Sequence, residues 1–131
     1  MEDTNADVCI VGAGIAGLTA GYLLAREGKS VVILDDKPVA DSQSVRTTGH
    51  LANAIDDRYT EVERLHGEAG ARLAAESHTA AIDRIEAISR EEKIDCDFER
   101  LDGYLFVPPG ESTDILHQEL AAARARRPRG R

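Results

Sequence analysis

The sequence has only two cysteines, no long apolar run and a deficit of basic residues, and each shortage excludes a class of protein. Cys9 and Cys96 lie far apart in the 131 residues and form no Cys-x-x-Cys pair, so the sequence predicts neither a zinc site nor a redox dithiol. No apolar run approaches the roughly 18 residues that a membrane-spanning helix requires. The formal charge of −8 argues against a general nucleic-acid or anionic-membrane binder.

What remains is the composition of an ordinary globular protein. The hydrophobic fraction is 42% and the charged fraction 31%, and a chain of this length predicts one domain. The acidic, polar stretch MEDTNAD resembles no secretory signal, so the expected compartment is the cytoplasm. Cys9 stands between Val8 and Ile10 in an apolar run, where a small buried side chain is expected.

Residues 7–36 have the pattern of a strand, a glycine-rich turn, a helix and a second strand. Residues 7–11 and 30–34 are short apolar runs, typical of strands that are buried on both faces. Between them, apolar side chains recur every three to four residues over 15–27, which predicts a helix with one buried face. Gly28 is expected to end this helix. A crossover helix of this length makes the two strands parallel neighbours, so we expect an α/β fold with a three-layer Rossmann-like core.

The rest of the chain predicts a long polar loop, helices and a hairpin. Residues 36–54 are broken and polar, which indicates a loop with at most a short helical turn. Residues 56–93 predict helix, bent or split near Gly67 and Gly70, and a further helix is expected after Ser112 or Thr113. Between these helices, residues 94–107 are expected to form a β-hairpin around Asp102-Gly103.

The turn after the first strand matches the dinucleotide-binding fingerprint G-x-G-x-x-G. In this motif the first glycine permits the tight turn, the second lets the pyrophosphate approach the backbone, and the third lets the helix lie close to the strand. Phosphates then meet the N–H groups and the positive end of the helix dipole. The residues expected to form this part of the site are Gly12, Ala13, Gly14, Ile15, Ala16 and Gly17.

Two acids follow the second strand. Asp35 is placed to accept hydrogen bonds from a ribose hydroxyl, and Asp36 stands beside it. Together they would repel the 2′-phosphate of NADP. The motif by itself does not separate FAD from NAD.

A longer pattern resembles the FAD-dependent amine and amino-acid oxidoreductases, the D-amino-acid oxidase and glycine oxidase-like group. The fingerprint continues through Gly21, Leu24, Gly28 and Val31 to Asp35, as at the start of that group. The runs SVRTTGHL (44–51), DDRY (56–59), LHGE (65–68) and AESH (75–78) are similar to a branch in which a Rieske iron–sulfur domain follows the flavin domain. The resemblance covers roughly residues 6–120.

The resemblance implies an FAD cofactor and an oxidoreductase that oxidises a small-molecule amine or amino acid by hydride transfer to the flavin. It also implies that the 44–51 loop passes near the pyrophosphate and flavin, with Arg46, Thr47, Thr48 and Gly49 as further cofactor-binding residues. His50 is expected to be a structural or flavin-packing residue. The resemblance implies no particular catalytic residue in this segment, and no metal ligand is expected.

Complete members of the group are several times longer, so residues 1–120 are expected to be the N-terminal part of an FAD-binding domain, an incomplete Rossmann-like fold. FAD retention by such a fragment is expected to be weak or absent. Residues 121–131 hold five arginines and no acid, and are expected to be a disordered tail from a truncated or frame-shifted product. A genuine tail that binds an acidic partner is the alternative. Two other functions stay open at this point, an NAD-dependent dehydrogenase or reductase and a non-catalytic dinucleotide-binding remnant.

Overall fold

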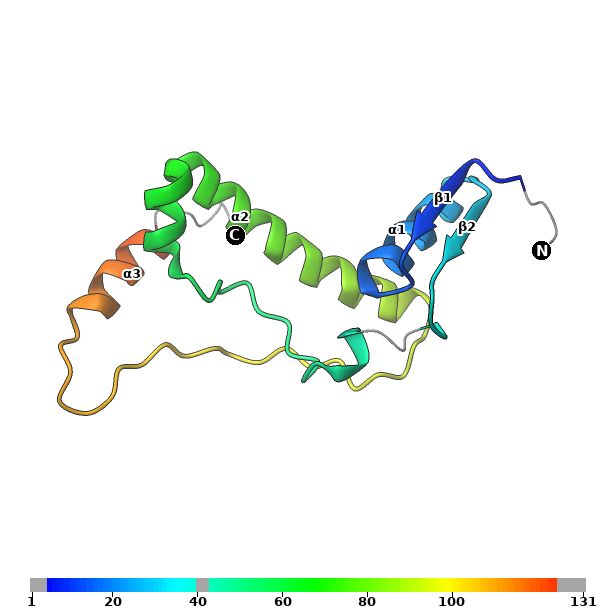
Figure 1. Ribbon diagram of the computed structural model, residues 1–131. Coiled ribbons are helices and arrows are strands. Elements are labelled where there is room, and N and C mark those ends of the chain that lie inside the picture. Colours follow the sequence, from blue (N-terminus) through cyan, green and yellow to red (C-terminus); the bar gives the residue numbers. More distant parts are fainter. Residues whose placement is uncertain (1–4, 40–42, 125–131) are drawn as a thin grey trace. The chain divides into compact units, whose positions relative to one another are not determined.

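A computed structural model describes residues 5–39 and 43–124, apart from the side chains of residues 43 and 45. The chain divides into two compact units, Met1–His50 and Leu51–Arg131, and each is treated by itself below (Figure 1). Of the predicted basic tail, residues 125–131 lie outside the described residues. The remainder, up to Arg124, is the end of a helix, so the predicted boundary at residue 121 falls inside that helix.

The first unit is a β-α-β arrangement. Strand β1 (Val8–Val11) leads into helix α1 (Ile15–Arg26), which leads into strand β2 (Val31–Leu34). The strands pair in parallel, with Val8 opposite Val31 and Val11 opposite Leu34. The predicted elements and their parallel pairing are therefore confirmed, as is the α/β class. A short 3-10 helix, η1 (Gln43–Arg46), is the helical turn expected in the following loop.

Helix α1 packs against one face of the two-stranded sheet. Ile10 and Ile33 are opposite each other in the register and project toward this helix. A Cβ atom at Gly21 would lie 2.9 Å from Cδ1 of Ile33 and 3.6 Å from Cδ1 of Ile10, so a larger residue would require the Ile33 side chain to shift. The small residue at position 21 thus has a packing role.

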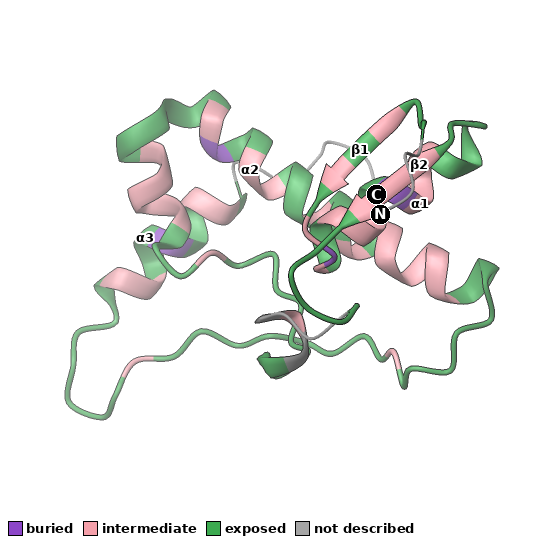
Figure 2. Cartoon of the chain, turned by 45° about the vertical axis from the view of Figure 1, so that its right-hand side comes forward, coloured by how far each residue is buried: buried purple, intermediate pink, exposed green. Residues whose placement is uncertain are grey.

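The opposite face of this sheet is exposed, which corrects three sequence-based expectations. Val11 is 85% exposed and Leu34 is 51% exposed, and Cys9 is exposed rather than buried. Figure 2 shows the alternation along β1 between half-buried and exposed residues. Since α1 covers one face, the described part of this unit has two layers, not the predicted three. Apolar runs indicate strands, but whether a second helix covers them depends on the tertiary structure.

Hydrogen bonds close the end of the β-α-β arrangement at which α1 finishes and both strands begin. At the end of α1, Gly28 has a φ of +78° and its N–H donates to the Ala25 carbonyl, while the Lys29 N–H donates to Leu24. This is a Schellman cap, as Gly28 led us to expect. At the amino ends of the strands, the Asp7 carboxylate accepts hydrogen bonds from the N–H and hydroxyl of Ser30, and these bonds lower the pKa of Asp7.

The second unit is built on two helices, α2 (Arg58–Glu91) and α3 (Asp114–Arg124), which pack together. The backbone of Gly67 leaves the helical region, with φ 70° and ψ 173°, so the predicted split of the long helix is confirmed at this residue. Ala71 is fully buried, whereas Leu65 and Leu73 are 57% and 67% exposed. Because the kink at Gly67 interrupts the 3.6-residue period, apolar positions on its two sides do not continue one stripe.

Glu119 of α3 closes the first turn of α2. Glu119 is 9% exposed, and its carboxylate accepts hydrogen bonds from the backbone N–H of Tyr59 at 2.6 Å and of Thr60 at 3.1 Å. Asp57, the residue before the helix, makes no side-chain cap hydrogen bond. The N-terminal cap of α2 therefore comes from a residue about sixty positions later in the chain.

The predicted β-hairpin over residues 94–107 is wrong, because these residues form no strand in the structure. Tyr104 and Phe106, which would share one face of a strand, are 84% and 79% exposed, and Leu105, which would lie on the other face, is 55% exposed. A two-stranded hairpin without such packing is marginally stable in water. The guanidinium of Arg100 instead bonds the carboxylates of Asp83 and Glu86 and ties the segment to α2.

Over the residues that the structure describes, no helix combines the length and the apolar character needed to cross a bilayer.

Candidate functional site

The glycine turn joins β1 to α1 at the carboxyl end of the sheet. Gly12 has a φ of +105°, which favours glycine, and its N–H donates to the Leu34 carbonyl at 2.7 Å. A Cβ atom at Gly17 would lie 1.9 Å from the Gly12 carbonyl oxygen, far inside contact distance. The turn and the first turn of the helix therefore touch, and no larger residue fits at position 17.

The N-terminus of α1 has the features of an anion site. Gly14 precedes the helix with an extended backbone (φ −80°, ψ −177°), and it has no side chain that could cap the helix. The first turn contains no acidic residue. Backbone N–H groups at such a terminus carry a partial positive charge and attract phosphate. The residues expected to cradle the pyrophosphate thus lie at the end of an element suited to that task.

Asp35 holds the glycine turn from the neighbouring strand. Its Oδ2 accepts a hydrogen bond from the Ala13 N–H at 2.6 Å, and its Oδ1 accepts one from the Lys37 N–H at 2.9 Å. The Ala13 bond, followed by the Lys37 bond, lowers the pKa of Asp35, so the carboxylate is ionised at neutral pH. Each carboxylate oxygen has a second acceptor position, so the group can still bind ribose hydroxyls. Asp36 is exposed beside it.

The segment 43–50 is connected to the same turn through Ser44. The Ile15 N–H donates to the Ser44 hydroxyl oxygen at 3.1 Å. The side chains of Arg46, Thr47 and Thr48 are exposed, as are Gly49 and His50. In the sequence, Ser44 stands out only as part of the family pattern, which predicts no contact for it. A hydroxyl residue in a polar loop is the only local signal, and it does not identify the partner.

Taken together, these residues fit a dinucleotide. Gly17 leaves no room for a side chain, the first turn of α1 presents N–H groups without a competing acid, and Asp35 lies ionised at the carboxyl end of the adjacent strand. Ligands of parallel α/β sheets bind at the carboxyl ends of the strands. No group of three or more His, Cys, Asp or Glu residues suited to a metal ion occurs among the described residues.

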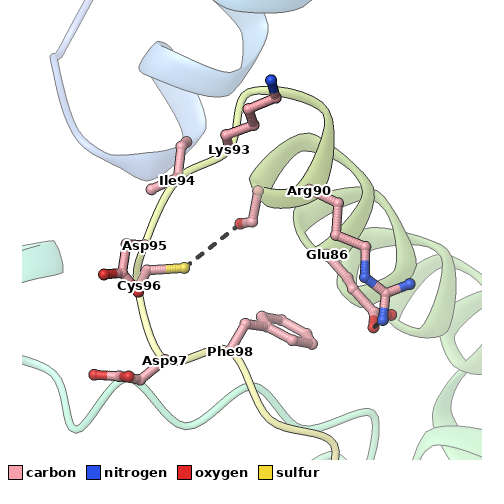
Figure 3. Close-up of a pocket in the computed structure, with 9 residues that line it drawn as sticks. Glu86, Arg90, Lys93, Ile94, Asp95, Cys96, Asp97 and Phe98 are labelled. Carbon is pink, nitrogen blue, oxygen red and sulfur yellow. Dashed lines mark hydrogen bonds and ion pairs between the residues drawn. The ribbon is translucent and has the colours of Figure 1, made fainter.

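The second unit contains a separate pocket of about 340 Å³ at the end of α2 (Figure 3). Its walls come from the last turns of α2 and from the segment after it, and the Cys96 thiol lies 3.7 Å from the Ser89 hydroxyl. None of its lining residues is expected to contact the cofactor. The pocket combines acidic and basic side chains, so its charge does not favour an anionic or a cationic ligand. Its lining residues are Glu86, Ser89, Arg90, Lys93, Ile94, Asp95, Cys96, Asp97 and Phe98.

Similar proteins are oxidoreductases and an iron–sulfur protein. The chain is 36% identical over 119 residues to YhfW of Bacillus subtilis, whose name describes a Rieske 2Fe-2S iron-sulfur protein. The aligned region covers 91% of this chain and 23% of that protein. The chain is 30% identical over 115 residues to the oxidoreductase OrdL of Haemophilus influenzae (88% of this chain, 27% of that one). It is 31% identical over 106 residues to gamma-glutamylputrescine oxidoreductase of Escherichia coli (81% and 24%).

The chain thus spans about a quarter of the length of these relatives. No solved structure matches it significantly. The family model described as FAD dependent oxidoreductase matches residues 7–131, which includes both the glycine turn and the helical unit. The resemblance seen in the sequence is thereby confirmed, and the chain belongs to the FAD-dependent oxidoreductase family.

Proposed function

We propose that this chain supplies the adenine-dinucleotide part of an FAD site in an enzyme that oxidises a small amine or amino acid. The proposal rests on one observation: three features lie together at the carboxyl end of the sheet. They are the glycine turn, the first turn of α1, which contains no acidic residue, and the ionised carboxylate of Asp35. Membership of an FAD-dependent family selects FAD over NAD as the dinucleotide. The relative named as gamma-glutamylputrescine oxidoreductase supports an amine as the substrate class.

In this proposal the two halves of the site have different tasks. The N–H groups of Ala16 and Gly17 in the first turn of α1 bind the pyrophosphate and oppose its negative charge, while the Ile15 N–H donates to Ser44 at the edge of the same turn. Asp35 accepts hydrogen bonds from ribose hydroxyls while its bond to Ala13 keeps the turn in place. The residues proposed to contact the cofactor are Gly12, Ala13, Gly14, Ile15, Ala16, Gly17, Asp35, Asp36, Arg46, Thr47, Thr48 and Gly49.

The chemistry itself belongs to the cofactor. A bound FAD would supply the acceptor for a hydride from the carbon beside the substrate's amine, and water would hydrolyse the imine product. The contribution of the residues described above is binding and orientation. Asp35 remains ionised and accepts hydrogen bonds, and it is not proposed to move a proton.

The test is an FAD titration of the purified chain, followed by quenching of flavin fluorescence, with NADH as the competing dinucleotide. We expect saturable FAD binding that is weak enough to be lost in gel filtration. Asp35→Asn removes the charge that ribose hydroxyls bind, and should raise the Kd about 10-fold or more, since hydrogen bonds to charged groups contribute about 1.5–3 kcal/mol.

Asp7→Asn is the matched control. Asp7 is also an exposed carboxylate with a lowered pKa that accepts backbone N–H, but it lies at the amino ends of the strands. Its replacement should leave FAD affinity unchanged. Absence of saturable FAD binding by the wild-type chain would refute the proposed cofactor site, and equal effects of the two substitutions would refute the role of Asp35. For the activity, bleaching of flavin absorbance at about 450 nm by amines, without oxygen, is the corresponding measurement.

A further inference from the structure

Ser44 links two parts of the site that are far apart in the sequence. Its hydroxyl oxygen accepts a hydrogen bond from the N–H of Ile15, the first residue of α1, at 3.1 Å. Ile15 belongs to the turn that faces the pyrophosphate in the proposed site. The 3-10 helix η1, which contains Ser44, is therefore attached directly to the phosphate-binding end of α1.

The segment that follows Ser44 is held together by its own hydrogen bonds. The Thr47 hydroxyl donates to the Ser44 carbonyl at 3.1 Å, and the Gly49 N–H donates to the Thr47 hydroxyl oxygen at 3.3 Å. Gly49 has a φ of +70°, which turns the chain at this point. Arg46 lies between these bonded residues, at the end of η1. Its backbone position thus depends on where Ser44 is attached.

We propose that Ser44 is a positioning residue of the dinucleotide site, which holds Arg46 beside the pyrophosphate-binding turn. The proposal deepens the function proposed above and depends on it. An exposed arginine loses side-chain entropy when it pairs with a phosphate, and a backbone that is already placed reduces that cost. An arginine on an unattached loop would have to order the loop as well.

The chemical nature of the link agrees with this role. A serine hydroxyl accepts the Ile15 hydrogen bond without adding a negative charge at the helix terminus, whereas an aspartate there would repel a phosphate. The first turn of α1 has no acidic residue of its own, so the terminus keeps its positive potential. Ser44 can thus tie the loop to the helix and leave the site favourable for an anion.

The experiment measures FAD affinity and amide hydrogen exchange in Ser44→Ala, Ser44→Thr and the control Ser77→Ala. Ser77 is an exposed serine on α2 whose hydroxyl donates to the Ala74 carbonyl. Loss of one hydrogen bond worth about 0.5–1.5 kcal/mol predicts that Ser44→Ala raises the Kd for FAD about 2- to 10-fold. Ser44→Thr, which keeps the hydroxyl, should restore wild-type affinity, and Ser77→Ala should not change it. Without FAD, the Ile15 amide should exchange faster in Ser44→Ala alone.

A double-mutant cycle separates positioning from a direct or a merely structural contribution. If Ser44 acts by placing Arg46, then Ser44→Ala has little further effect on FAD affinity in an Arg46→Ala background. Three results would each overturn the proposal. The first is that the two substitutions raise the Kd for FAD independently, so that their factors multiply in the double variant. The others are an unchanged Kd in Ser44→Ala, and tighter FAD binding in that variant because the hydroxyl competes with the phosphate for the Ile15 N–H. If the wild-type chain binds no FAD, the proposed function fails instead, and the Ile15 exchange rate still decides whether Ser44 anchors the loop.

Discussion

The contact between Glu119 and the start of α2 predicts a large effect from a single substitution. Glu119 is 9% exposed, and its carboxylate accepts hydrogen bonds from two backbone N–H groups, at 2.6 and 3.1 Å, in the first turn of a 34-residue helix. In Glu119→Ala both N–H groups lose their partner, and the nearby Asp57 does not cap the helix. These donors then depend on water that reaches a half-buried region.

The magnitude follows from measured caps and charged hydrogen bonds. Loss of an N-terminal cap costs about 0.5–2 kcal/mol, and a hydrogen bond to a charged group contributes about 1.5–3 kcal/mol. We therefore expect Glu119→Ala to lower the free energy of unfolding by about 2–3 kcal/mol. Glu119→Gln keeps an oxygen acceptor but loses the charge that interacts with the helix dipole, so about 1 kcal/mol is expected.

Urea unfolding followed by circular dichroism at the helix band is the assay, with amide exchange at Tyr59 and Thr60 as the local measurement. Gln118→Ala, on the exposed side of α3, is the matched control and should leave both unchanged. If Glu119→Ala unfolds within about 0.5 kcal/mol of the wild type, the range of an ordinary surface substitution, the carboxylate is not the cap of α2.

Two further predictions concern the β-α-β unit. Gly17→Ala should destabilise the unit and weaken FAD binding more than Gly21→Ala does. The new Cβ would meet a backbone oxygen at 1.9 Å in the first variant, but a movable isoleucine side chain at 2.9 Å in the second. Urea unfolding and FAD titration of the two variants test this order, and equal effects would contradict it. Because hydrogen bonds depress the pKa of Asp35 in the folded state, its stabilising contribution is fully present above the unfolded pKa and is lost as pH falls through the lower folded value. NMR titration of the Ala13 amide should accordingly show its midpoint below the ordinary aspartate pKa of about 4, and a midpoint at or above that value would contradict the Asp35–Ala13 bond.

Local sequence patterns were sufficient where the interacting residues are close in the chain. Gly28 predicts the Schellman cap at the end of α1, because both capping bonds join residues within one helical turn of it. The same holds for the break at Gly67. The hairpin shows the limit of such patterns. Asp102-Gly103 favours a turn, but strands form only when a face is buried, and that depends on distant residues.

The sequence by itself determined the family and the order strand, glycine turn, helix, strand, because glycine spacing and apolar period within thirty residues specify them. It also predicted a cofactor-binding role for Asp35 from its place after the second strand. Only the tertiary structure decided that Ser44 bonds the start of α1, that Glu119 caps α2 and that Cys9 is exposed. Which residues are bonded or exposed depends on which surfaces meet in space. No periodicity along the chain encodes a contact between a polar side chain and a backbone N–H group tens of residues away.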